Sequence, residues 1–361
     1  MEEAFLALVR LGIGNAATEK LPDSINWNAI EALAKQHGLL GVLVDGVKQL
    51  PQSIYPPQTT WLRWIGEVIQ GYEQRYVAYK KAVADLGAWY HAHGYRMLLL
   101  KGLACGLDWP RPEHRPYGDI DIYLFGQYKE ADAVLTRELG IKVDNSHHHH
   151  TVFQWQGFTV ENHYDFVNVH VHRSSRELDA IFKNLAFQDS GFKFQDTSNI
   201  IHLPSYISLP SANLHALFLI RHMVCHFCGA SISLRQVLDW GFFLKTHHGE
   251  VDWKWLVDVL EKYHMKEFFD CVNAICVEEL GFDASSFPYI QFNPFVKERI
   301  LKDTLAPEFE TKTPKNVWKR VPFKYRRWKA NKWKRELCYE DGQWKTFWGG
   351  VWNHLLKPAG I

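Results

Sequence analysis

The chain has 361 residues, of which 47% are hydrophobic, so it can bury a sizeable core. Its formal net charge of +1 argues against a general nucleic-acid binder, which would be strongly basic. At about 150 residues per domain, the length predicts two or three domains. The six cysteines are irregularly spaced, which predicts reduced thiols and not a disulfide framework.

The first residues are acidic and lack the basic and then apolar segments of a signal peptide. No uncharged apolar run approaches the ~20 residues that a membrane-spanning helix needs. We therefore expect a cytoplasmic protein without a transmembrane segment.

Both ends of the sequence have helical periodicity. Apolar residues recur at helical spacing through residues 1–93, and Gly94 is suited to end the last helix there. Beyond Pro210 the pattern again predicts helices, over residues 211–228, 233–245, 252–264, 266–280 and 293–305. Helical regions are thus expected before and after a different central part.

The central part alternates with the period of strands. We expect strands over residues 96–100, 119–125, 141–143, 151–156, 158–165 and 167–172, with helices over 127–139 and 174–186. The fold class is therefore α+β, with a small mixed sheet flanked by helical regions. The predicted domains are residues 1–93, 94–209 and 210–361.

Two carboxylates lie two residues apart in one predicted strand. Asp119 and Asp121 point to the same face because side chains alternate along a strand. Like charges so close are costly unless a cation lies between them. Oxygen ligands of this kind suit Mg²⁺, which completes its shell with phosphate oxygens and water. A solvent-exposed pair without a ligand is the alternative, but the preceding strand, which ends in Lys101 and Gly102, makes it less favoured.

A third carboxylate is expected if metal ions bridge a triphosphate. Glu161, His163 and Asp165 share one face of the strand predicted over 158–165. Glu161 is the best candidate to complete the cluster and to help deprotonate an acceptor hydroxyl. Asp165 is a weaker candidate for the same role.

These motifs together resemble the bacterial uncharacterised nucleotidyltransferase family, within the DNA polymerase beta-like nucleotidyltransferase superfamily. The resemblance covers most of the chain, from the N-terminal helices to Trp240. The residues that carry it are Leu99-Leu-Lys101-Gly102, Arg115, Gly118-Asp119-Ile-Asp121-Ile, Val160-Glu161-x-His163-Tyr164 and Ser233-Leu-Arg-Gln-Val-Leu-Asp-Trp240.

The resemblance implies transfer of a nucleoside monophosphate from a nucleoside triphosphate (NTP), with release of pyrophosphate. Asp119 and Asp121 would hold Mg²⁺, and Glu161 would be the third carboxylate. Lys101 and Gly102 would stand at the triphosphate, where the superfamily usually has a Gly-Ser pair. The serine hydroxyl is absent here, and the interval from Gly102 to Asp119 is longer than usual.

Two further residues have alternative roles. Arg115 could contact a phosphate, or it could pair with Asp119 or another nearby carboxylate. His163 could orient Glu161 or approach the nucleotide, or it could be a hydrogen-bonded structural histidine. We include both among the nucleotide-binding candidates.

Two clusters of potential metal ligands lie outside this motif. Four consecutive histidines, His147 to His150, could form part of a zinc site, although a polar loop or a substrate-facing edge is favoured. The motif Cys225-x-x-Cys228 lies in a predicted helix without a second cysteine pair, so buried thiols in the core are favoured.

The C-terminal segment 312–335 contains eleven basic residues and no acidic residue, with aromatic residues interleaved. Such a segment could bind nucleic acid or an anionic membrane surface. It could also be a helix that packs its tryptophans on the core while its lysines extend to solvent. We favour the packed helix, because Trp344, Trp348 and Trp352 continue at helical spacing.

The sequence thus predicts a Mg²⁺-dependent nucleotidyltransferase that modifies a small molecule, a glycan precursor or a protein. Its partners would be an NTP and this acceptor, with peripheral membrane contact through the tail as a possibility. A toxin-like nucleotidyltransferase that modifies RNA is the enzymatic alternative. The non-enzymatic alternative is a nucleotide-binding module that tethers partners.

Overall fold

The computed structural model of the protein describes residues 1–170, 172–188, 204–288, 291–309, 314 and 317–340. The chain folds into two compact units. Of the described residues, the helical unit comprises those within Met1–Gln74, Asp108–Pro116 and Leu219–Tyr339. The sheet unit comprises those within Arg75–Leu107 and Tyr117–Phe218, together with Glu340. The three predicted domains remain a prediction.

The sheet unit is built on a mixed sheet of five strands in the order β3-β4-β2-β1-β5. The pairs β1–β2 and β3–β4 are antiparallel, whereas β2–β4 and β1–β5 are parallel. This arrangement confirms the predicted α+β class with a small mixed sheet. The strands are β1 (Met97–Leu99), β2 (Ile120–Tyr123), β3 (His150–Trp155), β4 (Phe158–His163) and β5 (Ile207–Ser208).

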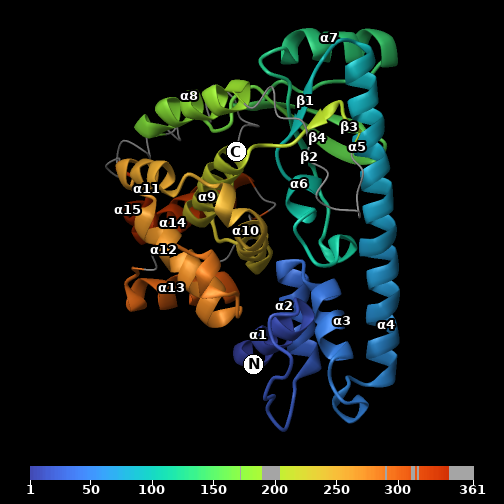
Figure 1. The fold of residues 1–361 in the computed structure, drawn as a ribbon, viewed down its shortest axis with the longest axis vertical. Coiled ribbons are helices and arrows are strands. Elements are labelled where there is room, and N and C mark those ends of the chain that lie inside the picture. Colours follow the sequence, from blue (N-terminus) through green and yellow to red (C-terminus); the bar gives the residue numbers. More distant parts are fainter. Residues whose placement is uncertain (171, 189–203, 289–290, 310–313, 315–316, 341–361) are drawn as a thin grey trace. The chain divides into compact units, whose positions relative to one another are not determined.

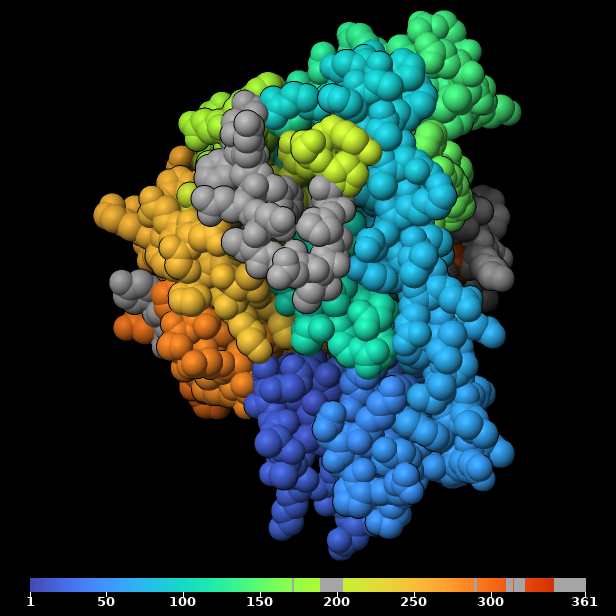
Figure 2. Space-filling view, turned by 45° about the vertical axis from the view of Figure 1, so that its right-hand side comes forward, coloured from blue at the N-terminus to red at the C-terminus, as the bar shows by residue number. Residues whose placement is uncertain are grey.

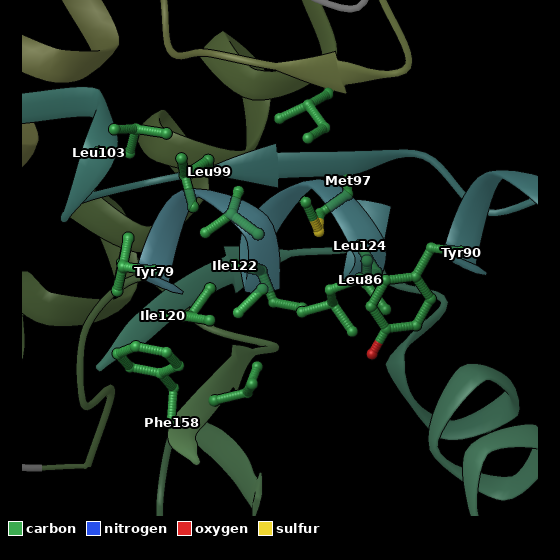
Figure 3. Close-up of a cluster of buried hydrophobic side chains, with 14 of the residues drawn as sticks. Tyr79, Leu86, Tyr90, Met97, Leu99, Leu103, Ile120, Ile122, Leu124 and Phe158 are labelled. Atoms are coloured by element: carbon green, nitrogen blue, oxygen red, sulfur yellow. The ribbon is translucent and has the colours of Figure 1, made fainter. Parts of the chain in front are cut away.

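One face of this sheet is apolar and carries the core of the unit. The side chains of Leu99, Ile120 and Ile122 are fully buried against Leu86 and Tyr79 of α5 (Figure 3). The helix α5 runs beside the strands in Figure 1, and its outer side lies at the surface in Figure 2. The helices of this unit are α5 (Gln74–Ala92), α6 (Leu103–Gly106), α7 (Tyr128–Leu139), α8 (Arg173–Gln188) and the start of α9 (Ala212–Gly229).

A buried polar network fixes α7 on the sheet. Asp132 accepts hydrogen bonds from Thr151 Oγ1 at 2.7 Å and from Asn162 Nδ2 at 2.9 Å. All three side chains are buried, so their mutual pairing avoids the cost of unsatisfied polar groups. The network joins α7 to β3 and β4, which are adjacent strands.

Two predicted strands are wrong. Residues 141–143 have no strand conformation, and next to them only the isolated bridge between Asp144 and Val152 forms. Residues 167–170 lie in a bend and a turn, because the chain leaves the sheet after His163 to begin α8. The alternation of valines with polar residues in that segment did not lead to a strand, because the segment does not pair with any strand of the sheet.

The helical unit packs its N-terminal helices closely. The helices α1 and α3 approach so closely that a Cβ added at Gly46 would lie 2.1 Å from the carbonyl oxygen of Leu8. The helices of this unit are α1 (Glu2–Gly12), α2 (Trp27–His37), α3 (Leu40–Lys48), α4 (Gln58–Val68), the rest of α9, α10 (Leu234–His247), α11 (Trp253–Lys262), α12 (Lys266–Ala274), α13 (Pro294–Leu305), α14 (Val317–Ala330) and α15 (Lys332–Cys338).

The long interval between Gly102 and Asp119 contributes a segment to the helical unit. Within residues 108–116, Trp109 Nε1 donates to Asp239 at 2.8 Å, and Arg111 contacts Asp45 at 2.6 Å. His114 also bonds Asp45, at 2.5 Å. This interval is therefore structured and is held by the buried carboxylates of Asp45 and Asp239.

The described part of the basic tail packs as helices. The ammonium group of Lys334 on α15 is buried and contacts Asp303 at 2.5 Å and the carbonyl oxygen of Ala230 at 2.6 Å. Trp333 lies 5.2 Å from Phe227 between ring centroids. The packed-helix interpretation agrees with these contacts, although Lys334 is buried where solvated lysines were expected. Residues 341–361, which include Trp344, Trp348 and Trp352, lie outside the described residues.

Among the described residues, no helix has the length and the apolar character to cross a membrane.

Candidate active site

The parallel pairing of β2 and β4 brings two predicted site residues together. Asp121 is the direct register partner of Glu161, and Tyr123 is the partner of His163. Neighbouring residues of each strand, such as Ile120, Ile122 and Val160, point into the apolar core. The opposite face therefore carries the polar side chains, as strand alternation requires.

Asp121 is the centre of the cluster. It is 4% exposed, and its Oδ1 lies 2.6 Å from Nζ of Lys101 and 3.3 Å from Nε2 of His163. The same His163 nitrogen lies 3.7 Å from Oε2 of Glu161. The predicted residues Lys101, Asp121, Glu161 and His163 are thus brought together in the sheet unit.

Asp119 lies one residue before β2, at the exposed edge of the cluster. Its backbone carbonyl accepts a hydrogen bond from the Tyr79 hydroxyl at 2.9 Å, which fixes the chain where the strand begins. Partial burial raises the pKa of Asp119, and the negative charges of Glu161 and Asp121 raise it further. The negative charges of Glu161 and Asp121 therefore interact with that of Asp119, as expected for carboxylates that share a cation.

The positive neighbours keep the inner carboxylates ionised. Burial opposes ionisation of Asp121, but Lys101 and His163 outweigh it and hold the pKa of Asp121 well below its usual range. Burial likewise opposes ionisation of Glu161, and His163, whose Nε2 lies 3.7 Å from Oε2 of Glu161, lowers the pKa of Glu161. Burial by itself would lower the pKa values of Lys101 and His163. The neighbouring carboxylates outweigh this effect, so both pKa values are raised.

Gly102 is needed for close packing beside this cluster. Its φ is 63°, in the left-handed region, and a Cβ added here would lie 2.0 Å from the Tyr79 hydroxyl oxygen. The same hydroxyl holds the Asp119 carbonyl, so Gly102 allows Tyr79 to reach the start of β2. A contact between the Gly102 backbone and phosphate remains a prediction.

Arg115 has a different partner from those predicted. Its Nε and Nη2 donate to the two carboxylate oxygens of Asp239 at 2.8 and 2.9 Å, and both residues are buried in the helical unit. A contact between Arg115 and phosphate stays a prediction.

Sequence reasoning did not identify Arg75. This residue, at the start of α5, donates from Nε to the carbonyl oxygen of Tyr117 at 2.5 Å, and its guanidinium lies 4.7 Å from the centroid of Phe158. Its positive charge lowers the pKa of Asp119. Nothing in a long amphipathic helix distinguishes Arg75 from other surface cations, so only the fold reveals its position.

Asp165 is engaged elsewhere. It forms an ion pair with Lys183 of α8, and Lys183 also contacts Asp179 at 2.6 Å. Asp165 thus helps hold α8, and its weaker candidacy for the metal stays a prediction.

The donor set fits a hard divalent cation. Oxygen atoms of Asp121 and Glu161 lie within 4.8 Å of each other and of a nitrogen of His163. The cluster contains three carboxylates, and Mg²⁺ characteristically uses one or two of these together with phosphate oxygens. Asp121 and Glu161 are therefore the carboxylates whose oxygens lie close enough to share a cation, and a metal contact by Asp119 stays a prediction.

Comparison with protein families agrees with this arrangement. A family described as "Uncharacterised nucleotidyltransferase" matches residues 23–281, which is more than half of the chain. The chain belongs to this nucleotidyltransferase family and is a transferase. No curated protein and no solved structure matched the chain.

Proposed function

We propose that this protein transfers a nucleoside monophosphate from an NTP to an acceptor hydroxyl and requires Mg²⁺. The observation that carries the proposal is the side-by-side placement of Asp121 and Glu161 on adjacent parallel strands, with Asp119 at the strand start. Membership of the nucleotidyltransferase family supports the reaction class.

In the proposed reaction, the acceptor oxygen forms a bond to the α-phosphorus of the NTP. The bond from this phosphorus to the oxygen that bridges to the β-phosphate breaks, and pyrophosphate leaves. Glu161 would accept the hydroxyl proton, because it lies beside Asp121 on the adjacent strand and its lowered pKa keeps it ionised. Bound Mg²⁺ would supply charge neutralisation for the triphosphate.

The cations of the cluster complement the phosphates. Lys101 contacts Asp121 in the structure, and its ammonium is a candidate to meet a phosphate oxygen. His163 acts as a positioning residue, since it bonds Asp121 and lies beside Glu161. Arg75 is a further candidate for the phosphates because its charge acts on Asp119.

The acceptor in this proposal is a small molecule, a glycan precursor or a protein. The reaction is proposed to take place in the cytoplasm. All six cysteines are free thiols, as expected for a reducing compartment.

The test is to incubate the full-length protein with cell extract and each of the four NTPs, labelled at the α-phosphate. We expect label from one or more NTPs to enter an acceptor when Mg²⁺ is present and to be lost when a chelator removes it. Treating the product with nuclease or protease identifies the acceptor class, and a nuclease-sensitive product would select the RNA-modifying alternative.

Matched variants test the assignment of residues. Glu161→Gln should abolish labelling, whereas Asp165→Asn should retain it, because Asp165 pairs with Lys183. Transfer by Glu161→Gln at the wild-type rate would refute the catalytic assignment. Nucleotide binding without transfer by the wild-type protein, in all extracts, would instead favour the tethering module.

A further inference from the structure

Three histidines come together beside the carboxylate cluster. His150 at the start of β3 lies directly opposite His163 at the end of β4. His149 is fixed next to them because its carbonyl oxygen accepts hydrogen bonds from the amides of Tyr164 and Asp165, at 3.0 and 3.1 Å. Ring centroids are 4.3 Å apart for His149 and His150, and 5.2 Å apart for His150 and His163.

The ring nitrogens converge in a protected position. One nitrogen from each of His149, His150 and His163 lies within 4.8 Å of the other two. His150 is 7% exposed and His163 is 4% exposed. The Nδ1 atoms of His149 and His150 are buried without a hydrogen-bond partner. A buried polar atom without a partner is costly, so these nitrogens indicate a missing ligand.

We propose that His149, His150 and His163 bind a zinc-class transition-metal ion, distinct from the Mg²⁺ of the carboxylates. Imidazole nitrogen suits Zn²⁺, Co²⁺, Ni²⁺ and Cu²⁺, whereas Mg²⁺ prefers oxygen. Zinc–nitrogen bonds of about 2.0–2.1 Å place tetrahedral ligands ~3.4 Å apart, so zinc would draw these nitrogens, which now lie within 4.8 Å of one another, closer together. Three histidine ligands leave the fourth position for water.

The two neighbouring sites share one residue. His163 bonds Asp121 through Nε2 at 3.3 Å and the carbonyl oxygen of Asp165 through Nδ1 at 3.4 Å, so a metal bond would replace one of these two contacts. Carboxylate partners of this kind orient metal-binding histidines and tune their basicity. His163 therefore links the zinc-class site to the carboxylate cluster, and this site goes beyond the proposed nucleotidyl transfer.

The alternative location for zinc is the set of Asp121, Glu161 and His163, whose donor atoms are also close. The two locations differ in their dependence on His149 and His150, and in their response to Mg²⁺. Excess Mg²⁺ would compete with zinc for a carboxylate-based site, whereas a three-histidine site offers Mg²⁺ no oxygen ligand and would keep its zinc.

The experiment is equilibrium dialysis of the metal-free, full-length protein against Zn²⁺ with Mg²⁺ in large excess. We expect one tightly bound zinc per chain. His149→Gln and His150→Gln should each weaken this binding by more than the ~10–100-fold that loss of an outer-sphere partner costs. Glu161→Gln should leave it within a few-fold of wild type.

A matched control comes from a second histidine pair. His222 and His226 lie one turn apart on α9, with ring centroids 4.4 Å apart, and are not part of a three-ligand cluster among the described residues. The double variant His222→Gln with His226→Gln should keep the tight zinc. Loss of zinc in this variant, with retention in His149→Gln, would overturn the proposal.

A measurement on the wild-type protein avoids any dependence on variant folding. X-ray absorption of the zinc-loaded protein should show scattering from three imidazole rings. Scattering dominated by carboxylate oxygen, or the absence of tight zinc in the folded protein, would also overturn the proposal. None of these readouts requires nucleotidyl transfer, so failure of one proposal is distinguishable from failure of the other.

Discussion

Buried charges are arranged differently in the two units of the molecule. In the helical unit, the buried cations Arg115 and Lys334 each have a carboxylate partner, Asp239 and Asp303 respectively. In the sheet unit, the carboxylates Asp119, Asp121 and Glu161 gather around Lys101 and His163.

We interpret the matched pairs of the helical unit as contributions to stability, and the carboxylate cluster of the sheet unit as a contribution to function. In a matched buried pair, each charge is compensated by the other. Removing one partner leaves the other charge buried without compensation, which strongly destabilises the fold. An excess of carboxylates leaves electrostatic repulsion that folding alone does not relieve: burial raises the pKa of Asp119, and the negative charges of Glu161 and Asp121 raise it further. Sites of this second kind are typical of functional centres.

The largest effect should come from removing a carboxylate of the cluster. Asp119→Asn should lower nucleotidyl transfer by at least ~10⁴-fold, which corresponds to ~5 kcal/mol in the transition state. Its folding stability should be unchanged or slightly higher, because one repulsive charge is gone. Transfer assays and urea unfolding check the two parts, and a marked loss of stability would assign Asp119 a structural role instead.

The helical unit should show the opposite behaviour. Lys334→Ala should lower the free energy of unfolding by about 3–5 kcal/mol, because it leaves Asp303 buried and unpaired. Replacing both residues, with Lys334→Met and Asp303→Leu, should recover most of that loss. Urea unfolding measures both variants, and a cost below ~1 kcal/mol for Lys334→Ala would contradict the buried pair.

Asp121→Asn lies between these two cases. It should abolish transfer, and it should also cost roughly 2 kcal/mol of stability, because Lys101 loses its nearest carboxylate. The cost is smaller than for Lys334→Ala, because the Lys101 side chain is 19% exposed and Glu161 still interacts with it. Equal stability losses in the two variants would remove this distinction between the units.

Lys101→Met separates phosphate binding from charge balance. We expect about tenfold weaker NTP binding, equivalent to ~1.4 kcal/mol, because one ammonium contact to phosphate is lost. Nucleosides without phosphate should bind as they do to the wild-type protein. Isothermal titration with both ligands checks this, and an equal loss for nucleoside and NTP would exclude the phosphate contact.

The smallest expected effect is the pH-dependent contribution of the His247–Asp108 ion pair to folding stability. His247 contacts Asp108 at 3.0 Å, and although burial opposes it, this carboxylate raises the pKa of His247 to about 9. A raised folded-state pKa stabilises the protein fully below the unfolded value of ~6.5, and this contribution is lost as pH rises from there through about 9. With the side chain about a third exposed, we expect ~1 kcal/mol after solvent screening.

His247→Gln tests this contribution directly. Urea unfolding at several pH values should show wild-type stability falling relative to the variant between pH ~6.5 and ~9. A constant difference between the two proteins across that interval would show that the ion pair does not contribute.

Several elements could be predicted because their signals are local. The hairpin at Gly157 agrees with the structure, with β3 and β4 close to the predicted bounds. Strand alternation correctly placed Asp121 and Glu161 on the polar face once their strands paired. Residues 141–143 and 167–170 show where prediction from local patterns fails. A strand-like pattern forms a strand only where the segment pairs with another strand.

The sequence by itself determined the fold class, the nucleotidyltransferase resemblance and the candidate carboxylates, since motif chemistry and periodicity are local properties. Only the tertiary structure decided which charges meet. It paired Arg115 with Asp239 and placed Arg75 where its positive charge interacts with Asp119. It also brought His149 and His150 close to His163. These partners are distant in sequence or on different strands, and strand register and helix packing alone set their distances.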